Sequence, residues 1–503
     1  MAGDMLNEAA RLAQGSDPAA ARPVIARLLA RDPHDADALT LSGLVAQRTG
    51  DAAEAVAAFG QARDADPANP ARIGNHAIAL KQAGRFAEAI AAFEAALAIR
   101  PAAAVTLANL GSCLIAAERA TEAERVLRQA VAAKPDHGEA WNSLGVALVR
   151  QRRAAEAIDA YRRALAIRPG HIEATLNLID ALIAAGDAEK AEPLSREMQR
   201  LHPANPRAAN QLAGLLERSG EREAAIQIYR EAFARGPINH PIGVNLATAL
   251  IAAGRDAEAL PVLDRLIAAL PTVTTPLALR CAALDRLGQA EMRDALMAVD
   301  RFVSIHDIDA VMGFASIDIF NRALEAELRA HPSLTFEPAG LVTRGGRQSD
   351  ELTNADTPAI AALAALARNA LAERIVSIGS GDHAFLMARP ERWSLTMWGT
   401  ILSPGGAVDP HIHAPNWLSG VYYPTLPAAT DDGEAGWFAI GALPDRLGGG
   451  GTIRTMAPRP GRMILFPSYL WHATLPFGGD AERISFAFDL VPEGIGRPHR
   501  LDR

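Results

Sequence analysis

The residues of this sequence that could bind a metal are three histidines, two of them two positions apart. His411 and His413 belong to the stretch Asp409-Pro-His-Ile-His413, and His472 follows the apolar stretch Leu465–Trp471. Positions two apart on a β-strand face the same side, so both imidazoles of the pair can reach one ion. Imidazole nitrogen is a good ligand for iron. Two histidines on one strand and a third farther along therefore predict a mononuclear metal site.

An anion site is predicted beside the metal. Arg483-Ile-Ser485 begins eleven residues after His472, on the next apparent strand, where Arg483 and Ser485 share one face. A guanidinium fork pairs with a carboxylate through two parallel hydrogen bonds. The pair therefore predicts that a carboxylate binds next to the metal.

The elements that carry these residues are short strands. From about residue 393 the sequence consists of runs rich in aromatic and β-branched residues, separated by glycine and proline turns. This spacing is typical of a β-sandwich or jelly roll. The expected strands are Trp398–Leu402, Ser419–Tyr423, Gly436–Ile440, Arg462–Pro467 and Arg483–Leu490. Two helices are expected before them, near 317–330 and 357–374.

The first half of the chain repeats. Prolines recur every 34 residues, at positions 33, 67, 101, 135, 169, 203, 237 and 271. Small residues recur at one offset (Gly43, Ala77, Gly111, Gly145), large ones at another (Phe59, Phe93, Leu127, Tyr161), and glycines at a third (Gly50, Gly84, Gly186, Gly220, Gly254). Small residues let two helices approach and large ones fill the gap, so each repeat predicts two antiparallel helices with a glycine turn.

This pattern resembles the tetratricopeptide (TPR) family over roughly residues 2–273, with residues 274–298 as a further, capping helix pair. The groove of such an array is lined mainly by the first helix of each pair. Asparagines occupy nearly the same repeat position there: Asn75, Asn109, Asn142, Asn177, Asn210 and Asn245. An asparagine ladder can hydrogen-bond the backbone of an extended peptide, as in the groove of TPR-containing glycosylating enzymes. Asparagine is also common at this position in TPRs that lack such a role.

The composition excludes several classes of protein. Hydrophobic residues make up 49% and charged residues 21% of the 503, which indicates globular domains rather than a disordered chain. The net charge of −8 argues against nucleic acid as the main partner. Cys113 and Cys281 lie in helical stretches and are expected as buried free thiols. No signal peptide is recognisable and no apolar run approaches the roughly 20 residues of a membrane span. We therefore expect a soluble, cytoplasmic protein.

The second half resembles a bacterial family of 2-oxoglutarate/Fe(II) oxygenases that are often fused to TPRs. The resemblance covers about residues 315–491 and rests on the order and spacing of several motifs: Gly345-Gly-Arg-Gln-Ser-Asp-Glu-Leu352, Trp398-Gly-Thr-Ile401, His411-Ile-His413, Trp417-Leu-Ser-Gly-Val-Tyr-Tyr423, Phe466–His472 and Arg483-Ile-Ser485. It implies that His411 and His472 bind iron and that Arg483, supported by Ser485, holds the distal carboxylate of 2-oxoglutarate. Tyr422 or Tyr423 would reach the same carboxylate, depending on strand register.

The third metal ligand is open at this stage. The wider superfamily has His-x-Asp/Glu…His, and here His413 occupies the carboxylate position. His413 can bind the metal itself, which would leave the bound iron more positive by one charge. Asp409 can supply a carboxylate instead, or the site can have two histidines and water.

The sequence thus predicts a multidomain protein: an all-α TPR superhelix (1–298, about eight repeats plus capping helices) and a double-stranded β-helix, or jelly-roll, domain with flanking helices (299–503). The expected function is a dioxygenase that uses Fe(II), 2-oxoglutarate and O2 to hydroxylate a protein or peptide held in the TPR groove, with no catalytic residue beyond the metal centre. Two alternatives stay open: a TPR scaffold with a non-catalytic β-domain, and a three-histidine dioxygenase that does not use 2-oxoglutarate.

Overall fold

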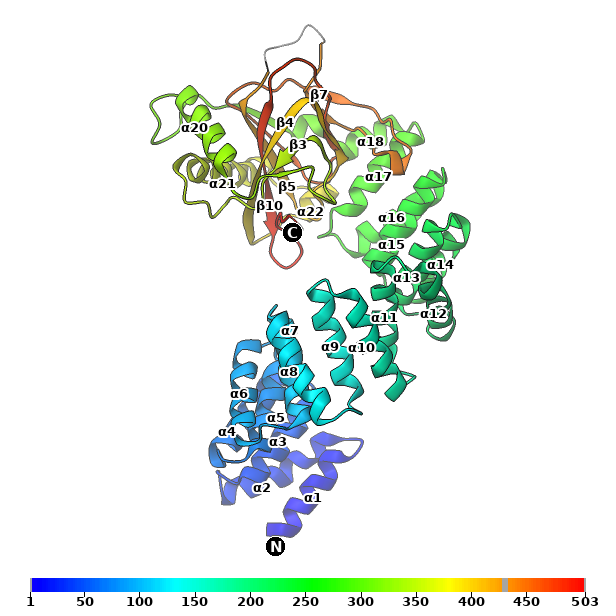
Figure 1. Ribbon diagram of the computed structural model, residues 1–503, viewed down its shortest axis with the longest axis vertical. Helices are drawn as coiled ribbons and strands as arrows, with labels where there is room; N and C mark the ends of the chain where they lie inside the picture. Colours follow the sequence, from blue (N-terminus) through cyan, green and yellow to red (C-terminus); the bar gives the residue numbers. More distant parts are fainter. Residues whose placement is uncertain (1, 428–432, 502–503) are drawn as a thin grey trace. The chain divides into compact units, whose positions relative to one another are not determined.

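The computed structural model describes residues 2–427 and 433–501, which form two compact units, Met1–Leu215 and Leu216–Arg503. Helices make up the first unit, and the second joins further helices to a β-sheet domain (Figure 1). A TPR array followed by a curled antiparallel sheet confirms the predicted fold class. The predicted boundary between residues 298 and 299 stays a prediction.

The first unit is a series of antiparallel helix pairs. Its helices are α1 (Ala2–Gln14), η1 (Pro18–Ala21), α2 (Arg22–Arg31), α3 (Ala36–Thr49), α4 (Ala52–Ala65), α5 (Pro70–Gln82), α6 (Phe86–Ile99), α7 (Ala104–Ala116), α8 (Ala120–Ala133), α9 (Gly138–Arg150), α10 (Ala154–Ile167), α11 (Ile172–Ala184), α12 (Ala188–Leu201) and α13 (Pro206–Arg218), in which the unit ends. Each periodic proline lies two residues after the second helix of a pair, where it cannot continue the helix.

The turn inside each pair requires a left-handed residue. Glycine supplies it at most repeats, for example Gly50 with a φ of 84° and Gly186 with a φ of 78°. Glu118 (φ 60°) and Arg152 (φ 59°) occupy the same repeat position without being glycine. The turn is therefore maintained by the packing of the helices even where the residue does not favour it.

Small and large residues of each pair meet as the periodicity predicts. A Cβ atom placed on Gly145 would lie 2.4 Å from the ring of Tyr161, and one on Gly43 would lie 2.7 Å from the ring of Phe59. Both rings are buried, each 2% exposed. The glycines let the first helix rest directly on the aromatic side chain of the second. Cys113 is buried and unpaired, as is Cys281 of the second unit, which confirms the expectation of free thiols.

The second unit begins with the last helix pairs and continues into the sheet domain. Its helices are α14 (Arg222–Arg235), α15 (His240–Ala252), α16 (Asp256–Ala269), α17 (Thr275–Arg286), α18 (Ala290–Met297), α19 (Val299–Phe302), α20 (Ile317–Ala330), α21 (Pro358–Ile378), α22 (Ala384–Met387) and η2 (Asp445–Leu447). Its strands are β1 (Ser304–Asp307), β2 (Thr335–Phe336), β3 (Thr343–Gln348), β4 (Trp393–His411), β5 (Leu418–Thr425), β6 (Phe438–Ile440), β7 (Arg454–Met456), β8 (Arg462–Pro467), β9 (His472–Thr474) and β10 (Arg483–Pro492). No described helix is long and apolar enough to cross a lipid bilayer.

The strands form one antiparallel sheet that curls on itself. Its order is β1-β8-β5-β10-β4-β9-β6-β7, with β3 added to β4 and β2 added to β3. The sheet curls because β4 is long: its first half pairs with β10 and its end pairs with β9. The strand therefore passes from one wall of the domain to the other, as a jelly roll requires. Helices α20 and α21 lie on one side of the sheet domain and α17 and α18 on the other (Figure 1).

Helices α17 and α18 contact the segment that carries His472. The indole N–H of Trp471 donates to the carbonyl oxygen of Ala278 at 2.9 Å, and the hydroxyl of Tyr469 donates to the carbonyl oxygen of Leu296 at 2.6 Å. Trp471 and Tyr469 are almost fully buried, at 3% and 0% exposed. The capping helix pair is therefore built into the sheet domain, directly behind a predicted metal ligand.

The glycine-aromatic contact predicts the effect of a single methyl group. Gly145→Ala should lower the free energy of unfolding by about 1–3 kcal/mol, because the ring of Tyr161 has no room to move away. Gly74→Ala, in helix α5, meets no atom within 4 Å and should raise it by up to about 1 kcal/mol, since alanine favours helix. Urea unfolding of the full chain measures both; equal shifts for the two variants would contradict the predicted packing.

Candidate metal centre and anion site

Two neighbouring strands bring the three histidines together. His411 ends β4 and pairs in register with His472, which begins β9. His413 lies two residues beyond β4, where its backbone N–H donates to the carbonyl oxygen of Ser468 at 2.9 Å. The segment before His472 is thus hydrogen-bonded to the backbone of His413. Histidines 59 residues or more apart in the sequence meet because β4 and β9 are adjacent in the sheet.

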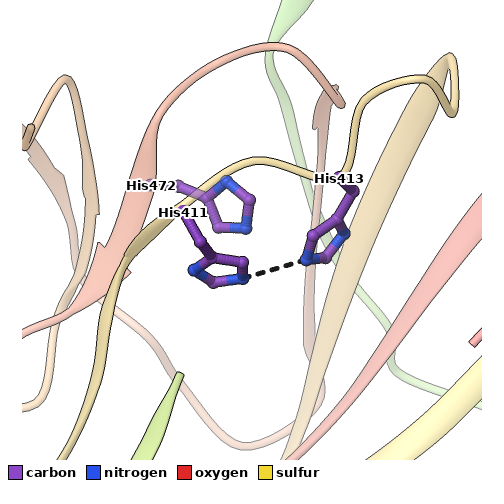
Figure 2. Close-up of side chains that lie close together, drawn as sticks. All are labelled: His411, His413 and His472. Atoms are coloured by element: carbon purple, nitrogen blue, oxygen red, sulfur yellow. Dashed lines mark hydrogen bonds between the residues drawn. The ribbon is translucent and has the colours of Figure 1, made fainter. Parts of the chain in front are cut away.

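The three imidazoles converge on one point (Figure 2). Each imidazole contributes one ring nitrogen that could bind a metal ion, and these three nitrogen atoms all lie within 4.8 Å of one another. The ring centroids of His411 and His472 are 4.2 Å apart, and His413 lies 4.9 Å from the first and 4.8 Å from the second. The Nε2 atoms of His411 and His413 are 2.9 Å apart. Two nitrogens bound side by side to one ion at about 2.1 Å lie about 3 Å apart, so this spacing fits a shared metal.

The outer nitrogen of every ring is already bonded. Nδ1 of His411 donates to the carbonyl oxygen of Asp409 at 2.8 Å, and Nδ1 of His472 donates to that of Leu470 at 2.9 Å. Nδ1 of His413 lies 2.7 Å from a carboxylate oxygen of Asp489. These bonds place the proton on Nδ1 and leave the lone pair of each Nε2 pointing inward.

The inward nitrogens of the cluster suit a shared cation. Nε2 of His411 lies 2.9 Å from Nε2 of His413 (Figure 2), a distance at which the two nitrogens share either a proton, as a hydrogen bond, or a metal ion. Burial, with the nearby His413, holds the pKa of His411 down to about 3. Burial, with the other two imidazoles, also lowers the pKa of His472 well below its ordinary value. Both rings are therefore neutral at neutral pH, and a metal ion suits the cluster better than an added proton.

Asp409 lies away from the cluster. Its carboxylate accepts a hydrogen bond from Nε of Arg344 at 2.8 Å, and its side chain is 43% exposed. Only its backbone carbonyl serves the site, as the acceptor for His411. Of the possible third ligands weighed from the sequence, the structure brings the His413 ring into the cluster and leaves the Asp409 carboxylate at the surface.

Asp489 is the residue that sequence analysis missed. It is 3% exposed, and besides His413 it accepts hydrogen bonds from the Ser419 hydroxyl at 2.7 Å and the Asn416 amide at 2.9 Å. Asp489 follows Arg483 and Ser485 on the same face of β10, four positions beyond Ser485. The sequence feature that could have identified Asp489 is a carboxylate on the inward face of an otherwise apolar strand, because a buried carboxylate needs a partner. Asp489 thus places a carboxylate next to His413, which itself occupies the position of the usual carboxylate ligand.

The predicted anion site centres on a buried arginine. Arg483 is 1% exposed. Its Nε donates to the carbonyl oxygen of Gly436 at 3.2 Å, and its Nη1 donates to the hydroxyl of Ser485 at 3.3 Å. No carboxylate among the described residues forms an ion pair with it. Burial lowers the pKa of its guanidinium. A buried cation without an anion is costly, so this side chain is prepared for an anionic ligand.

The register of β5 separates the two candidate tyrosines. The ring of Tyr423 lies under the guanidinium of Arg483, 4.9 Å from its centre, and burial raises the pKa of its hydroxyl to about 12. The same guanidinium interacts with that buried hydroxyl, although no described residue completes a well-aligned hydrogen bond with it. The hydroxyl of Tyr422 donates instead to Asn321 of α20 at 2.6 Å, on the opposite face of the strand. Tyr423 therefore lies at the anion site and Tyr422 does not.

One cavity contains both sites. Its volume is about 320 Å³, and its walls include the three histidines, Arg483, Ser485 and Tyr423. Phe438 and Phe466 add apolar walls. An anion held by Arg483 and a metal held by the imidazoles would share this space, which is of the size of a small-molecule site.

The asparagine ladder of the repeats contains contacts between successive first helices. Lys81 of α5 donates to Asn109 of α7 at 3.1 Å, and Asn177 of α11 donates to Asn142 of α9 at 2.9 Å. Arg207 donates to Asn177 at 2.7 Å. Asn75 lies in α5, Asn210 in α13 and Asn245 in α15, which belongs to the second unit. Peptide binding by these residues stays a prediction.

Comparisons with known proteins agree with the two halves of the fold. Residues 396–489 match a family described as "Putative 2OG-Fe(II) oxygenase", a range that contains His411, His413, His472, Arg483 and Asp489. Tetratricopeptide repeat families match residues 6–70, 80–145 and 216–279, and the "Cytochrome c-type biogenesis protein H TPR domain" matches residues 124–242. No curated protein matches the chain.

Similar solved structures are helical-repeat proteins. The type IV pilus biogenesis factor PilW has a TM-score of 0.39 at 21% identity, covering 43% of this chain and 98% of its own. PilF of Pseudomonas aeruginosa has a TM-score of 0.38 at 17% identity, covering 42% and 97%. The APC/C hetero-tetramer Cut9-Hcn1 has a TM-score of 0.41 at 17% identity, covering 50% and 52%. At these TM-scores and identities, the similarities support no conclusion about this chain.

The cluster predicts which residue is the third ligand. His413→Ala should weaken Fe(II) binding by at least about tenfold, because one of three ligands is lost. Asp409→Asn should leave it within about twofold, since the Asp409 carboxylate lies at the surface and its carbonyl is retained. Anaerobic Fe(II) titration of both variants measures this. Loss of binding in Asp409→Asn with retention in His413→Ala would reverse the assignment.

The contact between Asp489 and His413 predicts a second effect on the metal. Asp489→Asn keeps the shape of the side chain but removes its charge, and should lower Fe(II) affinity by about 10- to 100-fold, as for other partners of histidine ligands. Glu434→Gln, at an exposed carboxylate of the same domain, is the matched control and should bind Fe(II) normally. Wild-type affinity in Asp489→Asn, with circular dichroism unchanged, would show that the carboxylate does not act on the metal.

Proposed function

The chain consists of tetratricopeptide repeats followed by a domain that matches the 2OG-Fe(II) oxygenase family, and from this premise we propose that it is an Fe(II)- and 2-oxoglutarate-dependent dioxygenase. Its substrate in this proposal is a protein or peptide recruited by the repeats. The asparagines of the first helices, of which Asn142 and Asn177 bridge neighbouring repeats, would hydrogen-bond the backbone of that peptide.

The observation that carries the proposal is a pair of unmet requirements in one cavity. Arg483 is a buried cation that no described carboxylate pairs with, and the imidazole cluster directs three nitrogens toward one point that suits a metal ion. A metal ion together with a small carboxylate satisfies both at once. 2-Oxoglutarate has a carboxylate at one end and a metal-chelating 2-oxo acid at the other, so its chemistry matches this arrangement.

Each end of the cavity has its own role. His411, His413 and His472 would hold Fe(II), and Arg483, Ser485 and the hydroxyl of Tyr423 would hold the distal carboxylate. Three protein ligands leave positions open for small ligands, as in facial-triad oxygenases. Fe(II) and 2-oxoglutarate, when bound, supply with O2 the oxidising power that hydroxylates an unactivated C–H bond.

The protein itself orients and shields the reactants. The imidazoles are fixed through their Nδ1 atoms by two backbone carbonyls and Asp489, so they need no rearrangement when metal arrives. The Tyr423 ring and the Gly436 carbonyl fix the guanidinium of Arg483. Phe438 and Phe466 place apolar rings beside His472 in the wall of the cavity, where they would keep water away from the metal.

A three-histidine dioxygenase that does not use 2-oxoglutarate is the second candidate. The observation that favours it is His413, which takes the position of the usual carboxylate and lies within the cluster. That enzyme would need no arginine in the cavity. The buried Arg483 therefore separates the two candidates.

Substitution of Arg483 tests the proposed function. Arg483→Gln should raise the dissociation constant of 2-oxoglutarate by about 10- to 100-fold, because charge-assisted hydrogen bonds are lost. The visible charge-transfer band of the anaerobic Fe(II)–2-oxoglutarate complex measures the binding, and Arg459→Gln, at an exposed arginine, is the control.

The outcomes separate the candidate functions. Wild-type 2-oxoglutarate binding in Arg483→Gln would contradict the assigned site. Iron binding by the wild-type protein without any such band would favour the three-histidine enzyme. A wild-type protein that binds no iron would leave a TPR scaffold with a non-catalytic domain.

A further inference from the structure

The last described residues form one wall of the cavity. We call residues 493–501 the C-terminal strap. The backbone of Arg497 exchanges two hydrogen bonds with the side chain of Asn416, at 2.9 and 3.1 Å. The ring of His499 stacks on Trp398 at 4.4 Å, and its backbone N–H donates to the Thr396 hydroxyl at 2.9 Å. The strap is thus fixed in place, with Arg497 and His499 both lining the cavity.

The strap lies at the metal end of the cavity. Asn416, which holds Arg497, also donates to Asp489, the carboxylate that bonds to His413. The Trp398 ring lies between His499 and His413, 5.2 Å from the latter. The strap therefore lies beside the metal end of the cavity, away from Arg483 at the start of β10.

The charges of the cavity leave one cation unused. Besides the histidines, its charged lining residues are Arg483, Asp489 and Arg497. Arg483 is assigned to 2-oxoglutarate, and both oxygens of Asp489 are hydrogen-bonded. Arg497 is exposed at the cavity wall, and burial together with its positive charge lowers the pKa of His240 in α15. Its guanidinium forms no hydrogen bond or ion pair with any residue in the described part of the chain.

A second donor faces the same space. Gln348 of β3 is 6% exposed and lines the cavity. Its Oε1 accepts from the Thr343 hydroxyl at 2.6 Å, which assigns the remaining amide nitrogen as a donor. Within 2–427 and 433–501, no residue accepts a hydrogen bond from that nitrogen. The cavity thus offers a guanidinium and an amide donor that the metal and the cosubstrate do not use.

We propose that Arg497 determines substrate specificity: the substrate carries a carboxylate, which Arg497 binds at the cavity wall while Gln348 donates to a second oxygen. This inference rests on the proposed function and names the substrate class of the same site. A guanidinium held by a fixed backbone recognises a carboxylate through two parallel hydrogen bonds. The carboxylate can come from an acidic side chain of a peptide or from a small organic acid.

The test uses the full chain with Fe(II) and 2-oxoglutarate under anaerobic conditions. The probes are acetyl-Ala-Ala-Asp-Ala-Ala-amide and its Asn counterpart, and N-acetyl-aspartate N-methylamide and its asparagine counterpart. Binding is read from the shift of the charge-transfer band. We expect at least one Asp probe to bind about tenfold more tightly than its neutral counterpart, since one charge-assisted contact is at stake. Preference in the peptide pair alone would identify a peptide source, preference in the small pair alone would identify a small acid, and preference in both would show that the aspartate side chain is sufficient for recognition.

Variants show whether Arg497 causes the preference. Arg497→Gln should remove it and Arg497→Lys should keep part of it, while Arg500→Gln, at an exposed arginine of the strap outside the cavity wall, should leave it intact. A normal band with equal or no binding of Asp and Asn probes, or with the preference retained in Arg497→Gln, would overturn this inference alone. Absence of the band in the wild-type protein would overturn the proposed function, and this inference with it.

Discussion

Three imidazoles and one guanidinium around a single cavity are the constraint on which the sheet domain depends. Each of these side chains is costly to remove from water unless it is hydrogen-bonded. Backbone carbonyl oxygens supply most of the hydrogen bonds: that of Asp409 accepts from His411 and that of Leu470 from His472. The carbonyl oxygen of Gly436 accepts from Arg483. What the described residues do not supply is a cation between the imidazoles and an anion beside the guanidinium. The cavity is therefore suited to bind a metal ion at one end and an anion at the other.

Strand β10 connects the two ends of this cavity. Its inward face carries Arg483 and Ser485 at the anion end and Asp489 beneath His413, and it lies between β4 and β5. The segment before His472 is held from the other side by α17 and α18, through Trp471 and Tyr469. The capping helices of the repeat pattern therefore serve as structural support for the metal site, so the repeats and the sheet domain are physically continuous at that point.

Periodic and local features of this protein were predictable from the sequence. The helix pairs follow from a spacing of 34 residues, and the contact of Gly145 with Tyr161 follows from small and large residues at fixed offsets. His411 and His413 were identified from their alternation. Asp489, Asn416 and the C-terminal strap were not, because their roles arise from contacts across 70 residues or more that no local pattern encodes. The choice between Tyr422 and Tyr423 likewise needed the register of β5, and the Asp409 carboxylate was drawn to the surface by Arg344.

The most direct measurement is a crystal structure of the full chain with 2-oxoglutarate and Mn(II), which replaces Fe(II) without reacting with O2. The account predicts one ion bonded to Nε2 of His411, His413 and His472, chelated by the 2-oxo acid, with the distal carboxylate on Arg483 and the hydroxyl of Tyr423. An ion held without His413, or a 2-oxoglutarate carboxylate away from Arg483, would contradict it.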